Sequence, residues 1–173
     1  MDIGQELLKE HSLGNTLKIV DYACTSQENF NQLMQCFLSN GYRVAQRAAW
    51  AVSYAASKKT SFINTHIKDL VEQLSRKDVH HAVIRNSVRI LQQIEIPEEF
   101  HGKVLNACFA FIENHDTPIA IKAFSLTTLD NLSKFYPEIR LELKLIIKDR
   151  WEIETPAFRS RAKKILLKCG VRF

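Results

Sequence analysis

The chain has 173 residues, of which 46% are hydrophobic and 25% charged, and its formal net charge is +5. This length suits one domain with its own core, and the composition is typical of a folded globular protein. No apolar run approaches the roughly 18 residues that span a bilayer, and residues 1–10 lack the apolar stretch of a secretory signal. We therefore expect a cytoplasmic protein with no membrane partner. Only five Gly and four Pro are present, which favours helices over sheets.

The chain begins with two short segments, residues 2–11 and 14–24, that we predict to form a capping hairpin over 1–25. After them comes an apolar stripe with the spacing i, i+3, i+4, i+7 of an amphipathic helix. The stripe recurs every 37 to 38 residues. Its four copies are Phe30/Leu33/Met34/Phe37, Ile67/Leu70/Val71/Leu74, Leu105/Cys108/Phe109/Ile112 and Leu143/Ile146/Ile147.

A polar break follows each stripe, and a second helical segment follows each break. These second helices are predicted over 42–57, 79–94, 117–133 and 156–168. Each proline lies where a helix should begin, and Thr117 and Thr155 are predicted helix N-caps. The pattern predicts a single all-α domain over 1–173, with four helical-hairpin repeats in 26–168.

The turn before the third of these second helices resembles that of a HEAT repeat, in which an acid precedes an apolar–basic pair. Asp116 is followed there by Ile121 and Lys122. We therefore identify the chain as similar to the HEAT-repeat and armadillo-like α-solenoids. The resemblance implies a right-handed α-α superhelix of about ten helices whose second helices line the concave face. It also implies a non-catalytic scaffold that binds a protein or peptide partner on that face.

Basic residues recur with nearly the same period as the stripe, at Arg47, Arg85, Lys122 and Arg161. Two interpretations of this series are open. The bases face a partner's phosphates or acidic side chains, or they pair with the acids of the turns, as the resemblance implies. Those acids are Asp78, Asp116 and Glu154. With Trp50 as the aromatic anchor, the predicted partner-binding residues are Arg43, Arg47, Trp50, Arg85, Arg89 and Lys122.

Nucleic-acid binding is the alternative function, because residues 139–173 carry ten bases and four acids. The bases of the last helix are Arg159, Arg161, Lys163, Lys164, Lys168 and Arg172. Some HEAT-like proteins are DNA glycosylases, and Trp50 and Tyr54 share a helix face that such an enzyme would use. The sequence has no Gly-rich phosphate loop, GxSxG motif or metal-binding histidine pair, so we predict no catalytic residues, metal or cofactor. The oligomeric state stays open.

Overall fold

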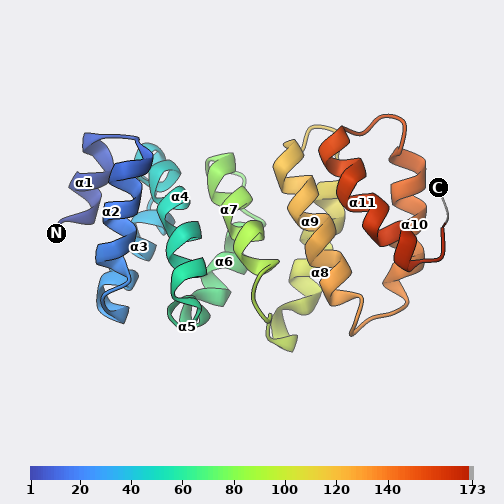
Figure 1. Ribbon diagram of the computed structural model, residues 1–173, viewed down its shortest axis with the longest axis horizontal. Coiled ribbons are helices and arrows are strands. Elements are labelled where there is room, and N and C mark those ends of the chain that lie inside the picture. Colours follow the sequence, from blue (N-terminus) through green and yellow to red (C-terminus); the bar gives the residue numbers. More distant parts are fainter. Residues whose placement is uncertain (172–173) are drawn as a thin grey trace. The chain divides into compact units, whose positions relative to one another are not determined.

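The computed structural model describes residues 1–171, and all regular structure in this part of the chain is helical (Figure 1). The four predicted second helices are present, and each of their ends lies within three residues of its predicted position. The expected all-α helical-repeat fold is thus confirmed. The elements are α1 (Ile3–Lys9), α2 (Leu13–Ala23), α3 (Gln27–Leu38), α4 (Tyr42–Lys58), α5 (Thr60–Ile63), the 3₁₀ helix η1 (Asn64–His66), α6 (Ile67–Gln73), α7 (His81–Leu91), α8 (Glu98–Glu113), α9 (Ile119–Leu132), α10 (Ile139–Arg150) and α11 (Pro156–Lys168).

The first helix of the second repeat is interrupted, since α5, η1 and α6 follow one another without a loop. Counted as one broken helix, they bring the described part of the chain to the expected ten helices. At the break the Thr65 hydroxyl donates to the carbonyl of Phe62 at 3.1 Å, and the amide of Gln27 also donates to that carbonyl at 3.2 Å. These side-chain bonds compete with the helical hydrogen bonds and account for the tighter turn.

The chain divides into two compact units, Met1–Ile96 and Pro97–Phe173. We call them unit 1 and unit 2. Unit 1 contains the hairpins α1–α2 and α3–α4 and the hairpin that ends in α6 and α7, whereas unit 2 contains α8–α9 and α10–α11. The single domain over 1–173, with its capping hairpin over 1–25, stays a prediction.

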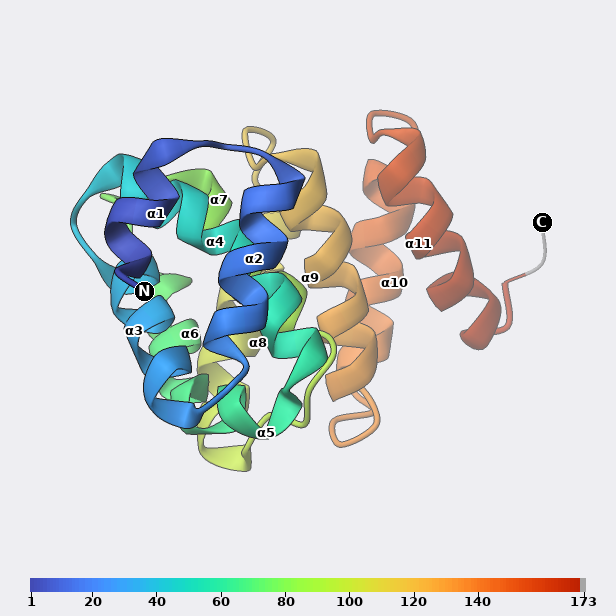
Figure 2. The same ribbon diagram turned by 60° about the vertical axis from the view of Figure 1, so that its left-hand side comes forward.

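Within each unit the second helices pack directly on one another. In unit 1, α4 contacts both α2 and α7, and in unit 2, α9 contacts α11 (Figures 1 and 2). Each of the four second helices of the repeats has a fully buried small residue near its middle, which allows this close approach. These residues are Ala49, Ser87, Ser125 and Ala162.

The predicted apolar stripes form most of the core, but the buried face of α8 is shifted and Ile146 of the fourth stripe is only partly buried, whereas Leu143 and Ile147 are fully buried. All four stripe residues of α3 are buried, and so are Ile67, Leu70, Val71 and Leu74. In α8 the buried residues are instead His101, Val104, Cys108 and Ile112, while two predicted ones, Leu105 and Phe109, are only partly buried. The buried face of α8 is therefore rotated slightly from the predicted one.

One of the two predicted threonine caps is confirmed. The Thr155 hydroxyl accepts a hydrogen bond from the backbone N–H of Phe158, which places Thr155 at the N-cap of α11. The prediction for Thr117 is wrong, because Pro118 occupies the N-cap of α9 and no side chain caps that helix. In the described part of the chain, no helix is long and apolar enough to cross a membrane.

Candidate functional site

The central second helix of unit 1, α4, presents one outward stripe of large polar and aromatic side chains. The opposite side of α4 consists mainly of alanines, among them Ala45 and Ala48, which are 4% exposed or less. Arg43, Trp50 and Tyr54 lie on the outward side, seven and four residues apart, which is the spacing of one helix face. The packing of α4 against its neighbours thus forces these three side chains outward.

The aromatic side chains of this stripe form a continuous row. The ring centroids of Trp50 and Tyr54 are 6.1 Å apart, and His11, from the loop before α2, meets Trp50 edge-on at 5.5 Å. Tyr54 is 36% exposed, and Trp50 is partly exposed. The row therefore lies at the surface rather than in the core.

Four arginines lie on α4 and on its neighbour α7. Arg47 donates to the backbone carbonyl of Leu7 at 2.7 Å, which ties α4 to α1. No ion pair or side-chain hydrogen bond joins Arg43, Arg85 or Arg89 to any other residue that the structure describes. We call the group Arg43, Arg47, Trp50, Tyr54, Arg85 and Arg89 the aromatic–arginine surface.

Contacts at both ends of α4 and α7 fix their alignment. Near their beginnings, Tyr42 and His80 meet edge-on with ring centroids 4.8 Å apart. Near their ends, the Ser57 hydroxyl donates to the side-chain carbonyl of Gln93 at 3.2 Å. The two helices therefore run side by side, and Arg85 and Arg89 lie on the helix that neighbours the one carrying Trp50 and Tyr54.

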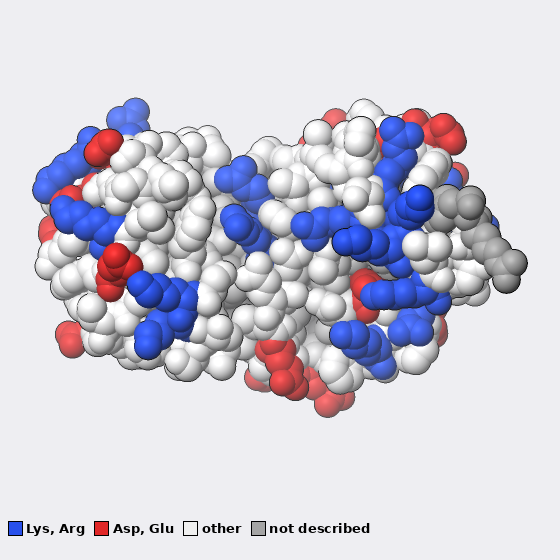
Figure 3. Space-filling view, viewed as in Figure 1, with Lys and Arg blue, Asp and Glu red and all other residues white. Residues whose placement is uncertain are grey.

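The charges of the chain are segregated between first and second helices. The second helices α2, α4, α7, α9 and α11 carry twelve Lys and Arg but only two acids, Asp21 and Asp130. The first helices α1, α3, α6, α8 and α10 carry seven bases and nine acids. Figure 3 shows the region over α4 as largely uncharged, with Lys and Arg side chains at its edges.

These positive surroundings affect a histidine at the start of α7. Burial lowers the pKa of His80, and the positive charges of His81 and Arg85 lower it further. The His80 ring nitrogen Nδ1 accepts a hydrogen bond from the backbone N–H of Ala82 at 2.9 Å and so caps α7. His80 is thus held in a neutral, helix-capping form and adds no charge to the aromatic–arginine surface.

Lys122, the sixth residue predicted to bind the partner, lies in unit 2 and points into its interior. Its ammonium group is 2.8 Å from Glu154, and the two side chains are 4% and 5% exposed. Arg150 completes the cluster with a hydrogen bond of 2.7 Å to the same carboxylate. Lys122 therefore pairs with a turn acid, as in the second interpretation of the basic series. It does not belong to the aromatic–arginine surface.

The offset of Lys122 follows from the register of the second helices. Measured from the buried small residue near the middle of each helix, Arg47 and Arg85 both lie two positions earlier. Lys122 lies three positions before Ser125, and Arg161 only one before Ala162. Each position turns a side chain by about 100° around the helix. The basic residues of the series therefore point in three different directions.

Asp78, the one of the three predicted turn acids that lies in unit 1, pairs locally. Asp78 accepts hydrogen bonds from Arg76 at 2.6 and 2.9 Å rather than from the arginines of the series. The hydrogen bond with Arg76 is the main cause that lowers the pKa of Asp78 and raises that of Arg76. Arg47 and Arg85 are thus not neutralised by Asp78.

Two of the predicted basic residues of α11, Arg161 and Lys168, contact α9. The Arg161 guanidinium lies over the Phe124 ring at 5.1 Å and donates to the Thr127 hydroxyl at 2.5 Å. Lys168 pairs with Asp130. Lys164, between them in sequence, is exposed and forms no ion pair with another described residue. Arg172 lies outside the described residues.

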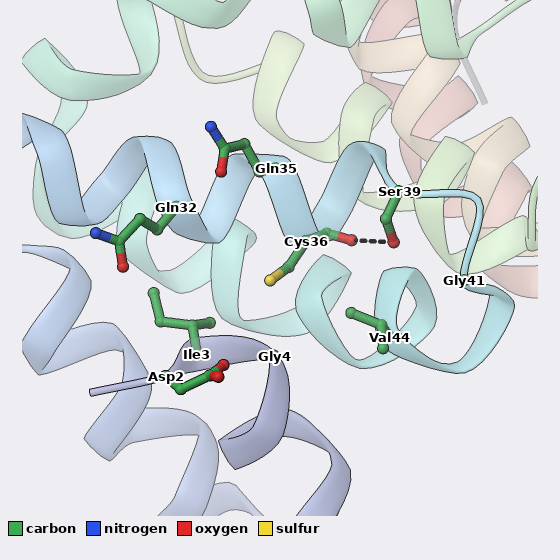
Figure 4. A pocket seen from close by; sticks show the side chains of 9 residues that line it. All are labelled: Asp2, Ile3, Gly4, Gln32, Gln35, Cys36, Ser39, Gly41 and Val44. Carbon is green, nitrogen blue, oxygen red and sulfur yellow. Dashed lines mark hydrogen bonds between the residues drawn. The ribbon is translucent and has the colours of Figure 1, made fainter.

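A hollow between α1 and α3 is a second candidate site (Figure 4). Its walls come from Asp2, Ile3 and Gly4 on one side and from Gln32 and Cys36 on the other. Asp2 is already engaged as the N-cap of α1, and burial raises the pKa of the Cys36 thiol. The hollow therefore offers neither a free carboxylate nor an activated thiolate.

Of the six residues predicted to bind the partner, all but Lys122 lie on α4 and α7 of unit 1. The predicted set does not include two aromatic neighbours of Trp50, His11 and Tyr54. His11 could not be found from spacing, because it lies in a loop outside the repeat. Tyr54 lies one turn after Trp50 in the sequence, a spacing that indicates a shared helix face, and from the sequence alone it is linked only to the glycosylase alternative.

Comparison with known proteins agrees with this architecture. The family model described as HEAT repeat domain matches residues 3–169. No curated protein and no solved structure matches the chain. The family match covers all of the helices given above, from α1 to α11. The protein therefore belongs to the HEAT repeat domain family.

Proposed function

We propose that this protein is a non-catalytic scaffold that binds an acidic protein or peptide segment on the aromatic–arginine surface of unit 1. HEAT repeat domains are helical-repeat scaffolds that commonly mediate protein interactions. The observation that carries the proposal is the aromatic row of His11, Trp50 and Tyr54, exposed beside two helices that contain no acid.

The aromatic row supplies the apolar part of the proposed interface. Trp, Tyr and Arg are the residues that most often dominate binding energy at protein interfaces, and they do so when a partner removes them from water. Trp50 and Tyr54 are held by the row and by α4, so little side-chain entropy remains to be lost on binding. They can therefore act as a preformed anchor for an apolar side chain of the partner.

The charge of the surface selects the partner's chemistry. The helices α4 and α7 together carry five bases and no acid, and only Lys58 among these bases forms an ion pair with a described residue, Asp21, at 2.6 Å. Guanidinium groups bind carboxylates in a planar, two-bond geometry. A segment with an aromatic or aliphatic anchor flanked by Asp and Glu would meet both features.

A peptide-binding measurement with the full chain tests the proposal. We expect labelled peptides with a Trp or Leu between acidic residues to bind, and the substitution Trp50→Ala to weaken binding by about tenfold or more. Phe135→Ala is the matched control, since Phe135 is an exposed aromatic residue of unit 2, and it should leave the affinity unchanged. Equal effects of Trp50→Ala and Phe135→Ala would refute the assignment of the site.

Salt dependence separates this function from the nucleic-acid alternative at the same surface. A complex anchored by Trp50 and Tyr54 should keep most of its affinity between about 50 and 200 mM salt, whereas a phosphate-driven complex with several contacts loses orders of magnitude, as is general for polyanions (about 10³-fold for six contacts). The glycosylase alternative requires release of an alkylated base, and a released-base assay on alkylated DNA tests it directly.

A further inference from the structure

The basic residues of α11 are not used by the proposed function, because they lie in unit 2. Three of them, Arg161, Lys164 and Lys168, are three and four residues apart and share one side of the helix, the side next to α9. Helix geometry spaces them by about 4.5 and 6 Å along the axis. We call these three residues the α11 basic stripe.

From this stripe we infer a second binding site, one for the phosphate backbone of a nucleic acid. The helix α11 has five bases and no acid, and Figure 3 shows Lys and Arg side chains spread over the place where Figure 1 draws this helix. A row of cations along one helix side attracts a chain of regularly spaced phosphates and releases its counterions.

Two of the cations are held in place by α9. Arg161 is fixed between the Phe124 ring and the Thr127 hydroxyl, and its planar guanidinium can stack on a base as well as contact a phosphate. Lys168 is anchored by Asp130 but stays 58% exposed, whereas Asp130 is only 17% exposed. Asp130 therefore holds Lys168 in place and balances part of its charge, while the lysine side chain stays largely exposed.

Neighbouring side chains favour a nucleic acid over the other anionic partners. A protein interface would need an apolar centre, but the ring of Phe124, beside the stripe, is covered by Arg161. A membrane surface would need several exposed apolar side chains on the same helix side, whereas Leu167, three residues after Lys164, is the one large apolar side chain that the described residues of α11 expose. The stripe itself offers charge and hydrogen-bond donors.

The inference is tested by fluorescence anisotropy with the full chain. The labelled ligand is a single strand of about 20 nucleotides or the same sequence as a duplex. At about 50 mM NaCl the double substitution Lys164→Gln/Lys168→Gln should weaken binding by about tenfold or more and lower the salt slope by about 1.4 for the single strand and about 1.8 for the duplex. The matched control Lys103→Gln/Lys148→Gln has the same net charge but changes exposed lysines of α8 and α10. It should leave the affinity within about twofold, as expected for charges outside the contact.

The inference would be overturned by an absence of binding at low salt (about 50 mM NaCl), by equal losses in the stripe variant and its control, or by equal competition from polyglutamate or anionic vesicles. The variant Arg85→Gln/Arg89→Gln separates this site from the one in unit 1. It should impair binding of the acidic peptide and spare binding of the oligonucleotide. The stripe variant should instead spare peptide binding and impair oligonucleotide binding, which would show that the two sites are distinct. A loss of oligonucleotide binding in the Arg85→Gln/Arg89→Gln variant would refute the site on α11.

Discussion

The substitution Glu154→Gln should destabilise unit 2 strongly. Glu154 accepts hydrogen bonds from Lys122 at 2.8 Å and from Arg150 at 2.7 and 2.9 Å, and its side chain is 5% exposed. The amide of Gln keeps one acceptor oxygen but carries no negative charge, so the ammonium group of Lys122, itself 4% exposed, loses its counter-charge in the interior. Removing one partner of a buried ion pair costs about 3–5 kcal/mol in the free energy of unfolding.

The substitution of the opposite partner should cost less. Lys122→Met leaves the Glu154 carboxylate bound by both donors of Arg150, so no buried charge is left alone. We expect a loss of about 1–2 kcal/mol for this variant. The order of the two losses thus tests whether Glu154 is the centre of the cluster, independently of their absolute size.

Urea unfolding followed by tryptophan fluorescence measures both losses. The chain has two tryptophans, Trp50 in unit 1 and Trp151 in unit 2, so a Trp50→Phe background reports unit 2 alone. A loss below about 1 kcal/mol for Glu154→Gln, against the roughly 3–5 kcal/mol expected for a buried pair, would contradict the reasoning. An equal loss for Lys122→Met would do the same.

The pH dependence gives an independent check on this cluster. Burial raises the pKa of Glu154, but the hydrogen bonds from Lys122 and Arg150 together outweigh burial and hold the pKa below its ordinary value of 4.5. A carboxyl with a lowered pKa in the folded state stabilises the fold above that ordinary value, and the contribution is lost as the pH falls through the lowered pKa. The difference between wild type and Glu154→Gln should therefore shrink below pH 4.5.

Four further substitutions test single features of the helices. Ser87 has a buried hydroxyl with no hydrogen-bond partner among the described residues, so Ser87→Ala should raise the free energy of unfolding by about 1 kcal/mol in urea unfolding; a loss would refute this. Thr155→Ala should lower the melting temperature through loss of about 1 kcal/mol of capping, whereas Thr117→Ala should have little effect. Hydrogen bonds from Lys18 and Lys9 lower the pKa of Glu6 to about 2. Protection of the α1 and α2 amides from hydrogen exchange should therefore fall as the pH drops from 4.5 towards 2, and Glu6→Gln should remove this dependence.

The repeat could be predicted from the sequence because its stripes bury whole side chains. Phe30, Leu33, Met34 and Phe37 form the first of the buried apolar sets that recur at a fixed interval, and an apolar residue on the wrong side of a helix would be costly. The register of α8 was predicted less well. Val104 and Leu105 are adjacent and both apolar, so the sequence pattern alone does not say which of them faces the core.

The basic series shows why a spacing could not identify the site. Lys122 is 37 residues after Arg85, and a shift of one residue moves a side chain by about 100° around the helix. The long lysine side chain reaches a buried carboxylate that is contributed by the turn after α10, 32 residues later. That contact depends on tertiary packing, and the local sequence around Lys122 does not contain it.

The segregation of charge between first and second helices supports the proposed surface, even though Lys122 of the predicted set points into the interior of unit 2. In unit 1, α4 packs against the second helices α2 and α7 and against the first helices α1 and α3, so only one narrow side of it meets solvent. An acid on that side would pair with the nearby arginines and cancel them. Because α4 and α7 contain no acid, their cations have no partner on their own helix, and their arginines remain available to an anionic ligand. This composition is set by the sequence once the helices are assigned, whereas the neutralisation of a particular base, such as Lys122, depends on an acid brought from elsewhere in the chain.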